Sequence, residues 1–89
     1  MSMYGANPEQ LAALGRSLQQ QIEQIDRVMH TVGSALTSTT WVGPARDRFE
    51  SDWNGTFRSA LQRLSSAFDA AGRDCVARST ELQRVMGAR

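Results

Sequence analysis

The sequence predicts an all-α protein, an antiparallel helix-turn-helix hairpin that dimerises into a four-helix bundle. Two long stretches carry apolar residues at helical spacing, and only a short segment of turn-forming residues separates them. So short a connection requires the two helices to lie antiparallel. The chain has 89 residues, and a lone hairpin of this size buries little core, so we expect a second hairpin to complete it.

The first helix is predicted to run from about residue 8 to residue 36. Asn7 can cap it, and Pro8 suits the first helical position because the N–H that proline lacks would be unpaired there. Two successive four-residue steps near the start of its apolar stripe interrupt the heptad pattern and predict nearly straight helices. The stripe consists of Leu11, Leu14, Leu18, Ile22, Ile25, Met29, Val32 and Leu36.

The predicted turn covers about residues 37–43. Hydroxyl and β-branched residues at its start favour caps and turns over helix interiors, and Gly43 before Pro44 is a strong break. Two interpretations of Trp41 stay open here. The ring can fold back over the end of the hairpin, or it can form a recognition surface, because tryptophan is enriched among binding hot spots.

The second helix is predicted to run without a break from about residue 44 to residue 86. Its rings at Phe49, Trp53 and Phe57, each four residues apart, are expected in the core. Pairing outward from Thr40 places the start of the first helix opposite the low seventies and leaves residues 74–89 as an overhang. The residues predicted to pack in the hairpin and the dimer are Leu18, Ile22, Ile25, Met29, Phe49, Trp53, Phe57, Leu64 and Phe68.

Composition narrows the classes of function. Ten basic and nine acidic residues give a net charge of +1, which does not describe a nucleic-acid or membrane-surface binder. One cysteine (Cys75) and one histidine (His30) cannot build a zinc site, and no catalytic constellation is seen, so we expect no metal, no cofactor and no enzymatic activity. No apolar run is long enough to span a membrane, and residues 1–7 lack the features of a signal peptide. Every basic residue is arginine, which suggests a bacterial genome of high GC content.

A short motif at the turn is the most informative feature. The segment Trp41–Gly43, followed by Ala45 and Phe49, matches the signature W-x-G-x-A-x-x-F between two helices. The chain thereby resembles the WXG, or ESAT-like, proteins exported by type VII secretion systems of actinobacteria and Firmicutes. The Asn-Pro-Glu-Gln start of the first helix and Trp53 are similar to that family as well, so the resemblance covers the whole chain.

The resemblance implies a secreted, non-enzymatic protein that leaves the bacterial cytoplasm folded and without a cleavable signal peptide. It implies a helical-bundle dimer with another WXG-type protein and recognition by the type VII secretion ATPase, as a substrate and co-export partner. The export signal of the family combines the WXG turn of one subunit with a C-terminal Tyr-x-x-x-Asp/Glu of the other. Trp41 and Gly43 are the positions that carry over.

The C-terminal region departs from that pattern. No aromatic residue follows Phe68 and the only tyrosine is Tyr4, so Ala77 stands four residues before Glu81 where the family has tyrosine. We therefore expect another chain to supply the tyrosine. This favours a heterodimer and keeps a homodimer as the alternative.

Three other interpretations stay open. The chain can be an intracellular helical adaptor with no role in export. It can be a membrane-active effector after release, although its polar helix faces and its net charge give that reading little support. It can also be an N-terminal targeting or chaperone-like domain of a larger toxin.

Overall fold

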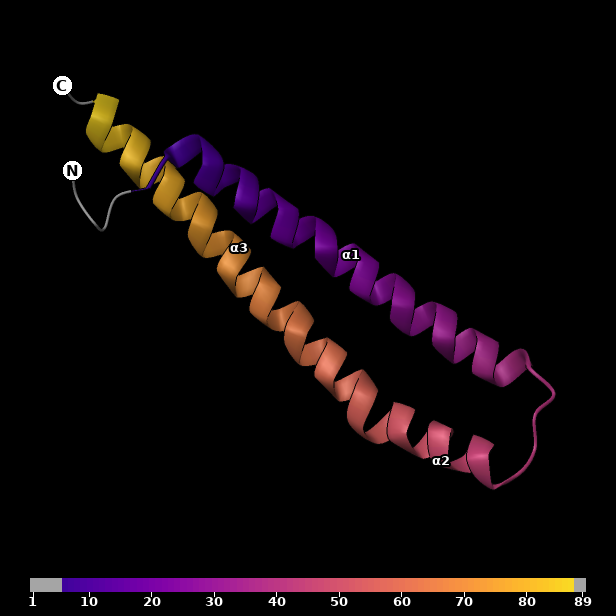
Figure 1. The fold of residues 1–89 in the computed structure, drawn as a ribbon. Helices are drawn as coiled ribbons and strands as arrows, with labels where there is room; N and C mark the ends of the chain where they lie inside the picture. The colour runs from indigo at the N-terminus through magenta and orange to yellow at the C-terminus, as the bar shows by residue number, and fades with distance from the viewer. Residues whose placement is uncertain (1–5, 88–89) are drawn as a thin grey trace.

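The computed structural model describes residues 6–87, which form a hairpin of two long helical arms (Figure 1). The first arm is α1 (Pro8–Ser38). The second arm consists of α2 (Pro44–Asp52), the π-helix η1 (Trp53–Phe57) and α3 (Arg58–Gly87). The predicted all-helical hairpin is therefore confirmed for these residues, while Tyr4 lies outside them. The molecule measures 67 × 21 × 15 Å, and none of its helices within the described range has the length and apolarity of a membrane span.

Local chemistry sets both ends of α1. The Asn7 side-chain oxygen accepts a hydrogen bond from the Gln10 backbone N–H over 3.0 Å, which caps the helix as the sequence predicts. At the other end, the Thr39 hydroxyl and its N–H both donate to the Ala35 carbonyl oxygen, over 2.6 and 3.0 Å. These bonds satisfy the last turn, so α1 continues to Ser38, two residues beyond its predicted end.

The two arms meet along one regular row of buried and half-buried residues, called the seam here. Its members recur at alternating steps of four and three residues on α1 and on α3, as expected where two helices pack along their length. The seam consists of Leu11, Gly15, Leu18, Ile22, Ile25, Met29, Val32 and Leu36 on the first arm and Trp53, Leu61, Ser65, Phe68, Gly72, Cys75, Ser79 and Leu82 on the second.

The predicted interruption near the start of the first stripe is wrong. Leu14 is 50% exposed, and the neighbouring Gly15 is buried in its place. The reason is the close approach of α3: a Cβ on Gly15 would lie 2.8 Å from the Gly72 carbonyl oxygen and 2.9 Å from Val76 Cγ2. Only a residue without a side chain fits at this crossing, so the heptad spacing of the seam is continuous.

The predicted pairing of the arms is also corrected. The Ser79 hydroxyl donates to the Pro8 carbonyl oxygen over 2.6 Å, and Gly72 lies against Gly15, so the start of α1 faces the end of the seventies. The pairing is centred near the bond between Gly43 and Pro44, later than Thr40. The expected overhang is therefore packed against α1 as far as Ser79, and α3 continues past the start of α1 to Gly87. Residues 88–89 of that segment lie outside the described range.

The prediction of one continuous α-helix for the second arm is wrong. The Arg58 N–H bonds to the carbonyl oxygen of Trp53, five residues earlier, which makes a single wide π turn. This turn takes up one additional residue, so the seam residues Trp53 and Leu61 are eight positions apart and still share one face. Phe57 is 45% exposed as a result and does not join the other two rings in the core.

Candidate functional site

The segment Thr39–Gly43 joins the arms at one end of the molecule (Figure 1). Trp41 is 42% exposed there, and Val42 is 90% exposed. Gly43 has φ 134° and ψ 175°, a combination that is essentially restricted to glycine. No atom lies within 4 Å of the place where its Cβ would be. The glycine is therefore required by the backbone conformation and not by a lack of space.

Trp41 lies at the edge of a shallow, predominantly apolar groove of about 260 Å³. Next to it, Phe49 stacks on Trp53 with the ring centroids 6.4 Å apart and the planes 18° from parallel. Because Trp53 is buried in the seam, this pair connects the turn with the core. Trp41 is thus a lining residue of this groove and is accessible from outside. The groove is lined by Thr31, Val32, Ala35, Leu36, Thr39, Trp41 and Phe49.

One flank of the hairpin is polar. It carries the residues that directly follow seam residues, among them Gln19 and Asp69. The Gln19 amide nitrogen donates across the arms to the Asp69 carbonyl oxygen over 3.2 Å and to its carboxylate over 3.4 Å. Arg73 Nε also donates to that carboxylate, over 3.2 Å. On this flank the two arms are therefore joined by a polar contact between Gln19 and Asp69.

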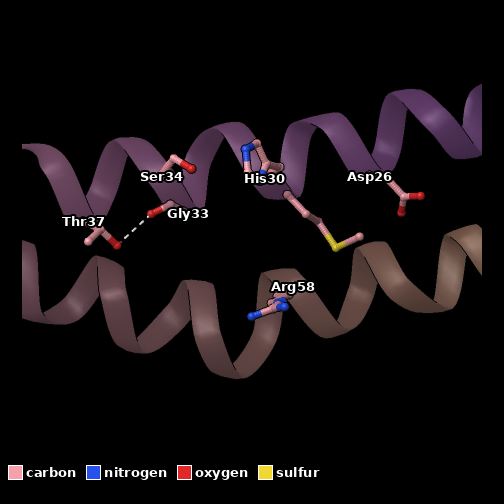
Figure 2. Close-up of a pocket in the computed structure, with 7 residues that line it drawn as sticks. Asp26, His30, Gly33, Ser34, Thr37 and Arg58 are labelled. Atoms are coloured by element: carbon pink, nitrogen blue, oxygen red, sulfur yellow. Dashed lines mark hydrogen bonds between the residues drawn. The ribbon is translucent and has the colours of Figure 1, made fainter.

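The polar flank opens into a cleft of about 630 Å³ between α1 and the start of α3 (Figure 2). Arg58 reaches it from the second arm, and the other lining residues belong to α1: Asp26, Met29, His30, Gly33, Ser34 and Thr37. The hydrogen bond in Figure 2 runs from the Thr37 hydroxyl to the Gly33 carbonyl oxygen over 3.0 Å and is local to α1. Within residues 6–87, the ion pairs are Arg46–Glu50, Arg73–Asp69 and Arg78–Asp74, so the cleft holds charges of both signs without an ion pair.

No metal site is formed in the described part of the chain, since no three His, Cys, Asp or Glu side chains gather there. His30 and Cys75 are far apart in the sequence and lie on different arms. Cys75 is a half-buried seam residue with a free thiol.

The opposite flank of the hairpin carries exposed residues without charge and is called the uncharged face here. All of them except Phe57 directly precede a seam residue, as Leu14 precedes Gly15, and Phe57 lies three positions before Ala60 on the same side of the helix. Its four large side chains, Leu14, Val28, Phe57 and Leu64, are between 42% and 50% exposed. The uncharged face consists of Gln10, Leu14, Ser17, Gln21, Gln24, Val28, Thr31 and Ala35 on α1 and Phe57, Ala60, Leu64, Ala67 and Ala71 on the second arm.

Charges return on this flank only beyond Ala71, at Asp74, Arg78 and Glu81. Arg78 Nε donates to the Asp74 carboxylate over 2.9 Å. This hydrogen bond and the charge of Asp74 raise the pKa of the Arg78 guanidinium. The charge-free part is therefore bounded, at the end away from the turn, by a local ion pair.

No family model, no curated protein and no solved structure matches this chain. Its function is therefore inferred from its own residues. Of the residues that the sequence singled out, Trp41 and Gly43 come together at the turn, whereas Phe57 and Leu64 lie on the uncharged face.

Sequence reasoning missed the crossing of Gly15 and Gly72 and the uncharged face itself. A glycine four residues after Leu11 and seven before Ile22 is the signal that could have revealed the crossing.

Proposed function

We propose that this chain is a non-enzymatic helical hairpin exported by a type VII secretion system, as a substrate and co-export partner of another WXG-type protein. One observation carries the proposal: an accessible Trp41 stands two residues before Gly43, a glycine with φ 134°, at the tip of an antiparallel hairpin. The W-x-G spacing that gave the resemblance thus coincides with a built turn. This proposal includes secretion without a cleavable signal peptide.

The turn is suited to recognition by its shape and position. Trp41 lines an open apolar groove and is 42% exposed, so a partner can bury its ring together with the groove. Gly43 and Pro44 fix the backbone that follows it. Because the turn lies at one end of a molecule 67 Å long, it stays accessible when the arms pack against another protein.

The uncharged face supports the second part of the proposal, pairing into a four-helix bundle. Exposed helix surfaces usually carry charged residues, and the cores of protein interfaces are depleted in them. Here Leu14, Val28, Phe57 and Leu64 lie on one flank, and Arg27 lines a shallow groove beside Val28. A second hairpin on this flank would bury these side chains.

The tyrosine half of the proposed signal belongs to the partner. On α3, Ala77 and Glu81 are exposed, which is the spacing of Tyr-x-x-x-Glu without its ring. A partner that carries the tyrosine would therefore complete the signal, and this favours co-export of two different chains.

The export role is tested with Trp41→Ala and the matched control Val42→Ala, its exposed neighbour. We expect Trp41→Ala to lower secretion at least tenfold in a host with an active type VII system, without a change in helicity or pairing. Val42→Ala should be secreted like the wild type.

Normal secretion of Trp41→Ala would contradict a role in recognition. Loss of helicity and pairing together with secretion would make Trp41 a structural residue. Retention of the wild-type protein in the cytosol of such a host would favour the intracellular adaptor instead.

A further inference from the structure

We infer that the cleft beside Arg58 is a binding site for an ω-amino carboxylate, a short linear molecule with an ammonium group at one end and a carboxylate at the other. In this site Asp26 binds the ammonium group and Arg58 binds the carboxylate. The inference goes beyond the proposed function, because neither the turn nor pairing with another hairpin enters into it.

The pairing of the arms shows which residues meet at the cleft. The arms pair about the bond between Gly43 and Pro44, so residues 26–34 of α1 lie opposite residues 53–61 of the second arm. Most of the residues that line the cleft belong to the first stretch, and the second stretch contains the π-helix η1. The cleft therefore lies level with the π turn.

The π turn explains why there is a cleft at this height. Trp53 and Leu61 are successive seam residues of the second arm, so the seam has a gap of eight positions between them. Phe57 is 45% exposed on one flank, and Arg58 lines the cleft on the other. Opposite the gap, Gly33 has no side chain to fill the space, and no atom lies within 4 Å of the place where its Cβ would be.

The size of the cleft is that of a ligand site. Its volume is about 630 Å³, within the range of roughly 300–1,000 Å³ that is typical of sites for small molecules. Such sites combine an apolar lining with a few polar groups that converge on the ligand. The cleft has both kinds of residue, since Met29 lies among the polar side chains.

The two charged residues of the cleft come from opposite arms (Figure 2). Arg58 lies opposite Met29, three residues beyond Asp26 along α1. Three residues rise about 4.5 Å and packed helix axes are about 8–10 Å apart, so the two backbones are roughly 10 Å apart. In the part of the chain that the structure describes, the ion pairs include neither Asp26 nor Arg58. The cleft therefore presents an anionic and a cationic group that do not bind each other.

A linear zwitterion matches this arrangement. The Arg58 guanidinium can bind a carboxylate through two parallel hydrogen bonds, and the Asp26 carboxylate accepts hydrogen bonds from an ammonium group. Met29, a half-buried residue between the two heights, offers an adaptable apolar surface to the methylene groups that connect the charges. A simple anion would meet the charge of Asp26 and a simple cation that of Arg58, so the cleft favours a ligand with both charges.

His30 and Ser34 add hydrogen-bonding groups at the carboxylate end of the site. Both line the cleft on the side of Met29 that is nearer to the turn. An imidazole N–H and a serine hydroxyl each donate to carboxylate oxygens. The carboxylate thus has neutral donors on α1 in addition to the charged donor on the second arm.

The test is a titration of the purified full chain with 6-aminohexanoate at pH 7, followed by the backbone amide shifts in NMR spectra. Hexanoate, which lacks the ammonium group, and hexylamine, which lacks the carboxylate, are the control ligands. We expect saturable shifts of the Gly33 and Arg58 amides with 6-aminohexanoate and at least tenfold weaker binding of each control. A peptide with a C-terminal lysine carries the same two charges; tighter binding of the peptide assigns the site to a chain end, and weaker binding assigns it to a free amino acid.

Four variants locate the binding. Asp26→Asn and Arg58→Gln each remove one charge of the cleft, whereas the matched controls Glu23→Gln and Arg63→Gln remove exposed charges of the same helices outside it. We expect the first two to raise the dissociation constant for 6-aminohexanoate at least tenfold and the controls to leave it unchanged, with circular dichroism to confirm helicity.

Three results would overturn the inference: no saturable shift with 6-aminohexanoate, equal binding of hexanoate or hexylamine, or equal dissociation constants for all four variants. None of these results bears on secretion, because the titration leaves the Trp41 turn unchanged. The proposed function is therefore tested separately.

Discussion

The crossing of the two arms at Gly15 gives a prediction with a built-in control. Gly15→Ala and Gly33→Ala each add one methyl group to α1. In the structure the new Cβ at residue 15 would lie 2.8 Å from the Gly72 carbonyl oxygen and 2.9 Å from Val76 Cγ2, whereas the Cβ at residue 33 would have no atom within 4 Å. The two variants therefore share the change in helix propensity and differ in the contact between the arms.

The expected difference follows from these contacts. Replacing glycine by alanine in a helix stabilises it by about 1 kcal/mol, and Gly33→Ala should show this gain. At residue 15 one of the opposing atoms is a backbone oxygen, so the arms must move apart, and such overpacking costs about 1–3 kcal/mol. Gly15→Ala should thus be about 1–3 kcal/mol less stable than Gly33→Ala. At about 4–8 °C per kcal/mol for a domain of this size, its Tm should be roughly 5–20 °C lower.

The assay is thermal unfolding by circular dichroism, with both variants at the same protein concentration because the proposed pairing would make Tm concentration-dependent. If Gly15→Ala melts at or above the Tm of Gly33→Ala, the arms do not cross at Gly15 and Gly72. The regular seam would then have to be abandoned.

Three further predictions concern the turn, the π-helix and the end of the hairpin where Ser79 meets Pro8. Gly43→Ala should lower the free energy of unfolding in urea by about 1–3 kcal/mol, because φ 134° strains any residue with a Cβ; unchanged stability would contradict that conformation. Deleting Gly55 should turn η1 into regular α-helix and keep Tm within a few degrees, whereas deleting the exposed Ser66 should abolish cooperative melting; equal damage by both would argue against the π turn. Ser79→Ala should cost about 1 kcal/mol and speed amide exchange in the first turn of α1; unchanged exchange would refute the bond to Pro8.

The hairpin could be predicted because its signals are local. The Asn7 cap, the proline at the start of each arm and the spacing of residues such as Ile22 and Ile25 act within a few positions of the chain. The glycine before Pro44 likewise marks the turn in the sequence itself. The number, type and relative direction of the arms therefore follow from the sequence.

The seam could not be predicted in detail because it depends on contacts between distant residues. By apolarity alone, Leu14 is expected in the seam and its neighbour Gly15 is not. Glycine occupies the seam because the backbone of Gly72, far along the chain, leaves no room for a side chain there. The π turn after Trp53 could not be predicted either, because aromatic residues at a four-residue step, such as Trp53 and Phe57, also fit a regular α-helix. The arms also pair about Gly43 and Pro44 rather than Thr40 because of contacts between distant residues, such as that of Ser79 with Pro8.

The candidate site also has one part set by local signals and one part set by long-range contacts. Trp41 and Gly43 could be chosen from a short motif, whereas the uncharged face becomes visible only after the seam is known. A residue such as Leu64 belongs to the core or to the surface according to the register of the seam. Sequence periodicity alone therefore grouped Leu64 with buried residues such as Trp53.

The most direct test of the proposed function is the binding of this chain to another WXG-type hairpin through the uncharged face. Leu64→Glu places a charge on that face, and Ala70→Glu, at an exposed alanine of α3 outside it, is the control. We predict that Ala70→Glu co-purifies with the partner like the wild type, while Leu64→Glu keeps its helicity and binds the partner at least tenfold more weakly. Equal binding by both variants would contradict pairing through the uncharged face.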